Sequence, residues 1–313
     1  MKIVYMGTPE FAVEPLKAMI EAGHEICAVV TQPDKKKGRG KAVQYSPVKE
    51  CALAYHLPVL QPEKIKAADA VKELREYPAD LFVVAAFGQI LSEEILQLPA
   101  YGCINIHASL LPKYRGAAPI HRAIIDGEQV SGVTIMQMER GLDTGDILLK
   151  REIPIAPDET ADSLHDKLAA LGAAMITEVL PMIQEGSIKP EKQDDAQSSY
   201  ANMLTKQMGQ IDWGKEAAEI ERLIRGLNSW PSAYTYHRGK LLKIWEAAVV
   251  EQAGTEVPVR PGTVIAVEKE WFDVATGGGV LRITMLQPEG KKKMTAAEYL
   301  RGYSLEKDTV FKG

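Results

Sequence analysis

The chain has 313 residues, of which 46% are hydrophobic and 25% are charged, and its formal net charge at pH 7 is −5. This composition excludes collagen-like, low-complexity and wholly disordered proteins, and the length is enough for about two domains. Because the charge balance is acidic, the chain as a whole is not expected to bind nucleic acids by bulk electrostatic attraction.

Short apolar runs alternate with helical patterns through the first half of the chain, which is typical of β-α-β units around a mainly parallel sheet. The predicted strands are 2–7, 25–31, 79–87, 102–109 and 131–138, and the predicted helices are 9–22, 46–56, 63–76, 92–98 and 117–127. A longer helix over about 160–186 has Leu164, Leu168 and Met175 at helical spacing and Thr160 as its N-cap. The pattern predicts a Rossmann-like, doubly wound α/β catalytic domain over 1–189.

Linker composition interrupts this pattern at 190–206, where Pro190 is followed by paired aspartates and paired serines. Beyond it, an amphipathic helix over 215–227 precedes short strand-like runs separated by glycine-containing turns. We predict that 207–313 forms a small C-terminal β-barrel domain, similar to the oligonucleotide-binding (OB) fold.

Several classes of site lack their usual motifs. The three cysteines, Cys27, Cys51 and Cys103, are far apart without CxxC spacing, which is typical of reduced thiols and not of disulfides or a zinc site. The first strand is followed by Gly7-Thr8-Pro9 and not by GxGxxG, and no Walker A, HExxH or GxSxG motif occurs. We therefore expect neither dinucleotide chemistry, phosphoryl transfer nor a metal.

We expect neither a membrane-spanning helix nor a signal peptide in this sequence. The longest apolar run, Leu81 to Phe87, is far shorter than the roughly 20 residues of a membrane-spanning helix. Lys2 leads directly into a strand-like run and then to Pro9, which leaves no room for the apolar core of a signal peptide. We expect a cytoplasmic protein that does not contact membranes, and we expect a monomer.

Polar side chains gather at the end of the strand predicted at 102–109. Side chains alternate between the faces of a strand, so Asn105, His107 and Ser109 are expected to share one face. Ligand sites of open α/β sheets lie beyond the carboxyl ends of strands, which is where this strand runs into Pro112. The sequence therefore predicts a site here, although His and Asn at strand ends also occur as purely structural residues.

A second candidate lies in the loop 139–146, after the next predicted strand. Gly141 and Gly145 flank Asp143 and would let the backbone approach a ligand or a neighbouring strand closely. An acid at the same edge of the sheet could approach His107, where it would favour the imidazolium and tune proton transfer near neutral pH. The structural alternative for Asp143 is an ordinary turn residue.

Together these motifs resemble the folate-dependent formyltransferase superfamily. The resemblance rests on Asn105-x-His107 running into Ser109-Leu110-Leu111-Pro112, and on Asp143. Three further segments are similar to the methionyl-tRNA formyltransferase family and extend the likeness over nearly the whole chain: Met6-Gly7-Thr8-Pro9-Glu10-Phe11-Ala12, Gly38-Arg39-Gly40-Lys41, and Arg225-Gly226-Leu227-Asn228-Ser229-Trp230-Pro231.

The resemblance implies a reaction. The formyl group of 10-formyltetrahydrofolate would pass to the α-amino group of methionyl initiator tRNA and give N-formylmethionyl-tRNA for translation initiation. Carried over by position, Asn105 would donate to the oxyanion, His107 would orient groups, move protons or share the oxyanion charge, and Asp143 would set His107 and accept a proton. The division of the proton steps between His107 and Asp143 stays open, because coupled groups titrate as a pair.

The resemblance also implies two binding surfaces. The folate would be bound by the turn Ser109, Leu110, Leu111 and Pro112 and by the segment Phe87, Gly88, Gln89, Ile90 and Leu91. The tRNA would contact the basic loop 34–41, through Lys35, Lys36, Lys37, Arg39 and Lys41, and also Lys206. Further phosphate contacts in the C-terminal domain could come from Arg222, Arg225, Lys240, Lys243 and Lys291 to Lys293.

Two alternatives remain at this point. A formyltransferase that acts on the amine of a sugar nucleotide would share the Asn, His and Asp residues and a similar length, and only the basic loop 34–41 argues against it. A non-catalytic RNA-binding protein would use the barrel and the basic loop alone, and its activity would not depend on His107.

Overall fold

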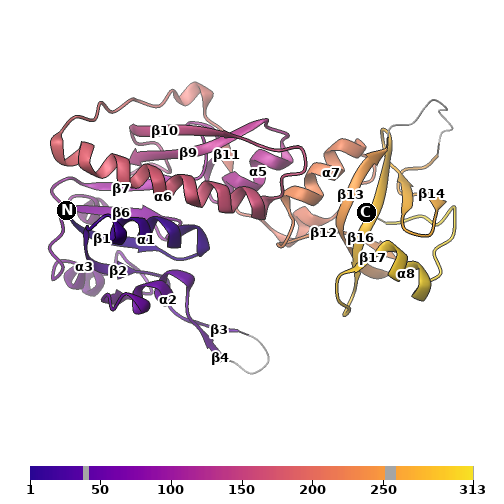
Figure 1. The fold of residues 1–313 in the computed structure, drawn as a ribbon, viewed down its shortest axis with the longest axis horizontal. Coiled ribbons are helices and arrows are strands. Elements are labelled where there is room, and N and C mark those ends of the chain that lie inside the picture. The colour runs from indigo at the N-terminus through magenta and orange to yellow at the C-terminus, as the bar shows by residue number, and fades with distance from the viewer. Residues whose placement is uncertain (38–41, 251–258, 313) are drawn as a thin grey trace. The chain divides into compact units, whose positions relative to one another are not determined.

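The computed structural model describes residues 1–37, 42–250 and 259–312, with only the backbone described at 36, 37, 42 and 43. The chain forms two compact units, each drawn in Figure 1. The N-terminal unit consists of Met1–Pro119, Val130–Pro154 and His165–Ala201, and the C-terminal unit consists of Ile120–Gln129, Ile155–Leu164 and Asn202–Gly313. The predicted boundaries of domain, linker and barrel stay a proposal.

A seven-stranded sheet is the centre of the N-terminal unit (Figure 1). Its strands, in spatial order, are β10 (Ile147–Pro154), β9 (Val130–Gln137), β7 (Cys103–His107), β6 (Leu81–Ala85), β1 (Lys2–Gly7), β2 (Glu25–Val30) and β5 (Val59–Leu60). The pairs from β7 to β5 are parallel, whereas β9 is antiparallel to β7 and β10 is antiparallel to β9. The predicted mainly parallel sheet is confirmed.

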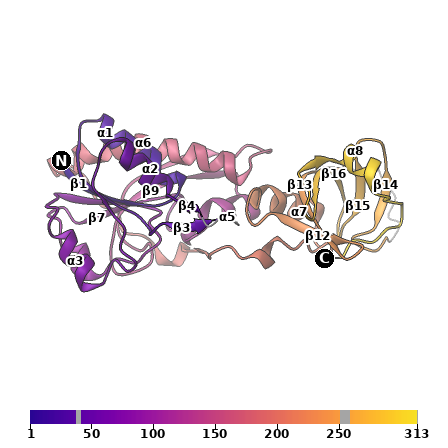
Figure 2. The same ribbon diagram turned by 90° about the horizontal axis from the view of Figure 1, so that it is seen from below.

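Helices cover both faces of this sheet. They are α1 (Val13–Glu21, after the 3-10 turn Glu10–Ala12), α2 (Pro47–Ala54), α3 (Ala68–Leu74), α4 (Glu93–Leu96) and α6 (Ala161–Glu185), whereas α5 (Pro119–Ile125) belongs almost entirely to the C-terminal unit. Figure 2 shows α1 and α6 on one side of the sheet and α3 on the other. On the α3 side, Val4 and Val84 of the sheet share a buried cluster with Leu74 of α3 and Ile95 of α4. The sheet is therefore doubly wound, as predicted.

The long helix α6 begins as its sequence predicts. Thr160 is the N-cap, and its Oγ1 accepts a hydrogen bond from the Ser163 amide at 3.2 Å. By length and composition alone α6 could cross a membrane, which is a weak indication because core helices of globular proteins pass the same test. In this chain Leu168, Met175 and Ile176 of α6 are fully buried within the protein.

The C-terminal unit is an antiparallel sheet that closes through the end of the chain. Its strands, in spatial order, are β12 (Ala233–His237), β13 (Lys240–Val250), β16 (Val280–Pro288), β15 (Phe272–Ala275) and β14 (Val264–Val267), with β17 (Met294–Thr295) paired to β16. Tyr236 of β12 bridges Lys312, and Thr263 next to β14 bridges Val310. Because 310–312 join the two edge strands, the sheet forms a closed barrel, as the glycine-separated strand pattern predicts.

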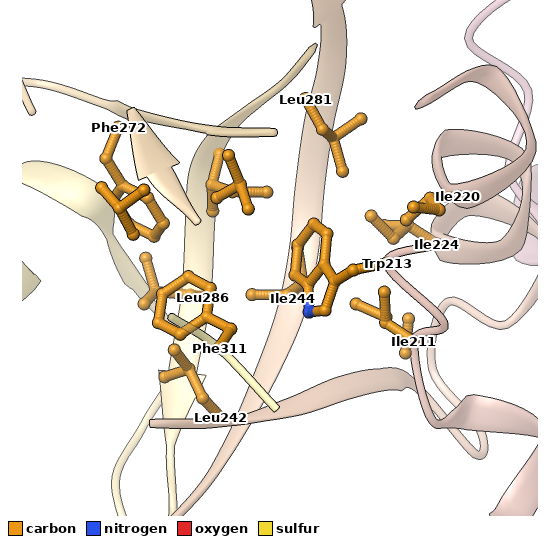
Figure 3. Close-up of a cluster of buried hydrophobic side chains, with 14 of the residues drawn as sticks. Ile211, Trp213, Ile220, Ile224, Leu242, Ile244, Phe272, Leu281, Leu286 and Phe311 are labelled. Atoms are coloured by element: carbon orange, nitrogen blue, oxygen red, sulfur yellow. The ribbon is translucent and has the colours of Figure 1, made fainter. Parts of the chain in front are cut away.

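The segment that precedes α7 contributes buried side chains to the core of the barrel. Ile211 and Trp213 precede α7 (Ala217–Gly226) and pack with Ile220 of that helix, Ile244 and Phe311 in the buried core shown in Figure 3. Trp213 Nε1 donates to Thr235 Oγ1 at 3.1 Å, so the buried indole keeps a hydrogen bond. The unit also contains the 3-10 turn Lys206–Gly209 and the helix α8 (Ala296–Gly302).

Candidate active site

Strand β7 carries the first two candidate residues to the carboxyl edge of the sheet. Asn105 lies beside Val84 of β6 and Met136 of β9, and His107 is the last residue of β7 beside Thr134. Asn105 is 9% exposed and His107 6% exposed. Within the described ranges, no protein group hydrogen-bonds the Asn105 side-chain amide, so its N–H groups can donate to a ligand.

The His107 ring has two different neighbours. Its Nε2 is 2.9 Å from the carbonyl oxygen of Tyr114, and its Nδ1 is 3.7 Å from Asp143 Oδ2. Because a carbonyl only accepts, Nε2 carries the proton in the neutral as well as the charged ring. Nδ1 is therefore the atom that can gain or lose a proton, and it faces the Asp143 carboxylate.

Asp143 is held in an uncommon conformation. Its φ is +52°, in the left-handed region, and its Oδ2 accepts a hydrogen bond from the Gly116 amide at 2.8 Å. The nearby Gly145 lies so close to β9 that an added Cβ would be 1.8 Å from the Gln137 carbonyl oxygen. The expected close approach of this loop to a neighbouring strand is thus found at Gly145, and the loop brings Asp143 to His107.

Strand β7 ends two residues earlier than predicted, so the alternation argument does not extend to Ser109. The Ser109 hydroxyl donates to the Lys113 carbonyl at 2.6 Å and closes a turn. Thr134 holds the same turn, since its Oγ1 donates to the Ser109 carbonyl at 2.7 Å and accepts from the Leu111 amide at 3.1 Å. Leu111 is fully buried in this turn.

The second segment expected at a folate site, 87–91, follows β6 at the same edge of the sheet. Phe87 and Leu91 are buried in the core, whereas the Ile90 side chain is 78% exposed. The Phe87 carbonyl accepts hydrogen bonds from Thr8 Oγ1 at 3.0 Å and from Gln32 Nε2 at 3.2 Å. Three loops, after β1, β2 and β6, are thereby joined beside β7.

The basic residues expected to contact tRNA are only partly within the described chain. Lys35 is exposed in β3 (Lys35–Lys37), which forms a hairpin with β4 (Ala42–Gln44), and Lys206 is exposed in its 3-10 turn. Arg39 and Lys41, and the side chains of Lys36 and Lys37, lie outside the described residues.

Two arginines proposed for phosphate contacts are engaged within the protein instead. Arg225 Nη1 donates to the Glu159 carbonyl at 2.7 Å, its Nη2 donates to Glu221 Oε2 at 2.9 Å, and Arg222 Nε donates to the Ile125 carbonyl at 3.3 Å. Spacing in the sequence carries no signal for such distant backbone partners.

No metal site is found in the described ranges. Their His, Cys, Asp and Glu side chains form no group of three or more that could hold an ion. Cys103, the first residue of β7, is buried in the cluster that contains Ile95 of α4, and burial raises the pKa of its thiol to about 12. This thiol is therefore not a nucleophile at neutral pH.

Sequence reasoning missed two residues that shape the site. Gln193 Nε2 donates to the carbonyl oxygens of Asp143 and Gly145, each at 2.8 Å, and Arg115 donates to Gln193 Oε1. Gln193 lies in the stretch predicted as a linker, where the aspartates and serines gave no sign of a structural role. Arg115 follows Pro112 in the expected loop, but its almost complete burial at 2% exposure could not be anticipated.

Comparisons with known proteins agree with the fold. Residues 1–180 match the family described as formyl transferase, and residues 203–304 match the formyl transferase C-terminal domain. The structure of an N-formyltransferase from Helicobacter canadensis is similar with a TM-score of 0.69 at 21% identity, covering 94% of this chain and 100% of that one. HypX from Aquifex aeolicus is similar with a TM-score of 0.66 at 19% identity, covering 100% of this chain and 50% of that one. The fold is that of the formyltransferases.

Two relatives with higher sequence identity show which family of formyltransferases this chain belongs to. The methionyl-tRNA formyltransferase of Caldanaerobacter subterraneus subsp. tengcongensis is 54% identical over 313 residues, covering 100% of both chains. That of Lachnospira eligens is 53% identical over 309 residues, covering 98% of both chains. The chain belongs to the methionyl-tRNA formyltransferase family.

Proposed function

We propose that this chain transfers the formyl group of 10-formyltetrahydrofolate to the α-amino group of methionyl initiator tRNA. The observation that carries the proposal is the convergence of Asn105, His107 and Asp143 at one edge of the sheet in a chain about half identical to methionyl-tRNA formyltransferases. The acceptor and the place of the reaction follow from the family, so the protein is expected to act in the cytoplasm where initiator tRNA is charged.

The reaction is an acyl transfer between two nitrogens. The lone pair of the methionyl amine attacks the formyl carbon, a new C–N bond forms, and the bond from that carbon to N10 of the folate breaks. One proton leaves the amine and one proton is added to N10, while negative charge develops on the formyl oxygen. The protein must therefore stabilise an oxyanion and carry a proton.

The three side chains match these tasks. The Asn105 amide, without a partner in the described part of the chain, donates to the formyl oxygen as it becomes negative. Asp143 Oδ2 and His107 Nδ1 face each other at 3.7 Å, and a small movement when substrate binds would bring them within hydrogen-bond distance. Loss of an oxyanion donor costs about 10²–10³ in rate, and loss of an acid-base group about 10²–10⁴.

A folate co-substrate fits the adjoining loops. Among the similar structures, the Helicobacter canadensis enzyme is in complex with folinic acid and HypX is in complex with tetrahydrofolic acid. In this chain we place the pterin against 87–91, where the exposed Ile90 offers an apolar surface, and against the turn Ser109 to Pro112. Both segments adjoin β7, so the donor's formyl group can reach Asn105.

For tRNA, we propose contacts from Lys35, Lys36, Lys37, Arg39, Lys41 and Lys206. In the barrel we add Lys243 and Lys293, because their ammonium groups lie 5.7 Å and 5.0 Å from the centre of the Trp245 ring. A ring flanked by two cations suits contact with phosphates and bases together.

The test is formyl transfer from 10-formyltetrahydrofolate to methionyl initiator tRNA by the wild type and by Asn105→Ala, His107→Ala and Asp143→Ala. A matched control is His165→Ala, because His165 of α6 also pairs with an aspartate, Asp166 at 3.0 Å, and its ring packs against Phe11. We expect the three site variants to lose at least about 10²-fold in rate and the control to keep wild-type activity.

The same assay with a sugar-nucleotide amine as acceptor separates the alternatives. Equal turnover of the two acceptors would refute the assignment to tRNA, and full activity of His107→Ala would refute the site. Arg39→Ala tests the basic loop: productive use of tRNA is expected to weaken while folate affinity stays unchanged, and a loss of folate affinity would contradict the placement.

A further inference from the structure

Residues 191–201, here called the crossing segment, connect the two loops that carry the site. At its start, the Glu191 amide and carbonyl bond the carbonyl and amide of Ile147, at 2.9 and 2.8 Å. At its end, Tyr200–Ala201 form β11, parallel to β8 (Arg115–Gly116). The segment is thus anchored both after the Asp143 loop and within the loop that follows His107.

Gln193 is the point where this segment contacts the Asp143 loop. Its Nε2 donates to the carbonyl oxygens of Asp143 and Gly145, both at 2.8 Å, and its Oε1 accepts from Arg115 Nε at 3.1 Å and Nη2 at 2.8 Å. Carbonyls can only accept and a guanidinium can only donate, so these neighbours fix which end of the amide is oxygen. All four hydrogen-bonding positions of the side chain are used.

Arg115 links this contact to the carboxylate of Asp143. Its guanidinium, 2% exposed, also bonds Asp195 Oδ1 at 2.7 Å, so the buried charge is paired. The next residue, Gly116, donates its amide to Asp143 Oδ2. Two hydrogen bonds therefore hold Asp143. Gln193 bonds its main-chain carbonyl, and the Gly116 amide bonds its side chain.

We propose that Gln193 is a positioning residue for formyl transfer, with Arg115 fixing the orientation of its amide. The inference rests on the proposed function, in which the Asp143 carboxylate must face His107. Asp143 has a φ of +52°, a conformation that an L-residue keeps only where its surroundings determine it. Without Gln193, two carbonyls of this loop lose their donor, and the loop can relax away from His107.

The first test compares Gln193→Ala with Gln197→Ala, the same change in the same segment. Among the described residues, the Gln197 side chain bonds only the exposed Asp194, at 2.8 Å, and no part of the Asp143 loop. We expect Gln193→Ala to lower kcat by about 10- to 10²-fold, with folate affinity and the KM for tRNA nearly unchanged. Gln197→Ala is expected to behave as wild type, and equal kcat values in the two variants would overturn the proposal.

Gln193→Glu distinguishes a role in positioning the Asp143 loop from a role in binding the Arg115 guanidinium alone. The carboxylate keeps an acceptor for Arg115 but offers no N–H to the carbonyls of Asp143 and Gly145. The proposal requires kcat of Gln193→Glu to be as low as that of Gln193→Ala. Restoration of wild-type kcat by glutamate would show that Gln193 serves only as a partner for the guanidinium.

A double-mutant cycle tests whether Gln193 acts through Asp143. In single-turnover assays, Gln193→Ala is expected to cause no further loss in an Asp143→Ala background, because the group that it positions is already absent. Multiplicative losses would contradict the proposal.

Hydrogen exchange provides a readout that does not depend on activity. The peptide that contains Gly116 is expected to exchange faster in Gln193→Ala than in Gln197→Ala, since the Gly116 amide bonds Asp143 Oδ2. Unchanged exchange would overturn the positioning role, whereas absence of formyl transfer by the wild type would refute only the proposed function.

Discussion

Thr134 shows how one buried hydroxyl shapes the site at the scale of a residue. It is fully buried opposite His107, and its Oγ1 both donates to the Ser109 carbonyl and accepts from the Leu111 amide. These two bonds fold the chain sharply after β7. The turn then returns the Tyr114 carbonyl to His107 Nε2, so Thr134 indirectly sets the orientation of the imidazole.

Thr134→Val tests this role with a side chain of the same shape. The Ser109 carbonyl and the Leu111 amide would both lose a buried partner, so we expect the free energy of unfolding to fall by about 1–3 kcal/mol and kcat to fall as well. Denaturant unfolding and the formyl-transfer assay measure the two effects. The control is Thr177→Val, because within the described part of the chain the Thr177 hydroxyl bonds only the Ala174 carbonyl, one turn earlier in α6. An equal loss there would refute a special role for Thr134.

The sequence identifies the residues proposed to take part in the reaction more readily than the residues that hold them in place. Asn105, His107 and Asp143 could be found because they fall at the carboxyl edge of the predicted sheet, where ligand sites of open α/β sheets lie, and because their motif resembles a known family. Gln193 and Thr134 could not, since a glutamine in a polar stretch and a threonine in a strand look the same whether they bond water or a catalytic loop. Their role depends on which distant backbone groups they meet.

At the scale of elements, the loop between β9 and β10 depends on a close approach that only glycine permits. A Cβ on Gly145 would lie 1.8 Å from the Gln137 carbonyl oxygen, so the backbone of one of the two must move. Asp143 is two residues away and accepts its hydrogen bonds from Gly116 and Gln193, both outside this loop. Movement of the loop therefore separates Asp143 from the groups that hold it.

We expect Gly145→Ala to fold but to lose up to about 10²-fold in kcat, because the carboxylate is displaced from His107. Circular dichroism would check the fold and the formyl-transfer assay the rate. Gly302→Ala is the control, since an added Cβ there meets no atom within 4 Å. Wild-type kcat in Gly145→Ala would show that the loop tolerates the shift.

The elements that sequence patterns predict are those with a buried face. β1, β6 and α6 appear within two residues of the predicted ends, because their apolar residues repeat at the period of the structure. β10 was not predicted, because it lies at the edge of the sheet and its middle residues, Lys150 to Glu152, are all charged and exposed. The hairpin β3–β4 begins with three lysines, which read as a solvated loop.

At the scale of the whole molecule, the closed barrel buries a histidine that responds to pH. His237 is 8% exposed, its Nδ1 is 2.6 Å from Tyr299 Oη, and its Nε2 has no partner among the described residues. Burial, and then the charge of Arg238, lower the pKa of His237 below its usual value of about 6.5. The unfolded chain therefore binds this proton at a higher pH than the folded barrel does.

Acidification is thus expected to destabilise the barrel, because the stabilisation present above pH of about 6.5 is lost as the pH falls toward the lowered pKa. The four tryptophans, Trp213, Trp230, Trp245 and Trp271, all lie in the C-terminal unit, so their fluorescence reports its unfolding. We expect the unfolding midpoint to fall between pH 7.5 and 5.5 in the wild type and in Tyr299→Phe, but less in His237→Gln. An equal fall in all three would exclude His237 as the cause.

Net charge decides how such a protein can bind tRNA. With −5 overall, the chain repels a polyanion at long range, so binding must come from local phosphate contacts whose strength falls with salt. Each contact contributes about 0.7–0.9 to the slope of log affinity against log salt concentration.

If Lys243 and Lys293 beside Trp245 each contact a phosphate, their joint replacement by glutamine lowers the slope by about 1.4–1.8. Titrations of tRNA at several salt concentrations measure it, with Lys307→Gln as a control for the same charge change at an exposed lysine of the same unit. Slopes equal to that of the wild type would place the tRNA on another face of the barrel.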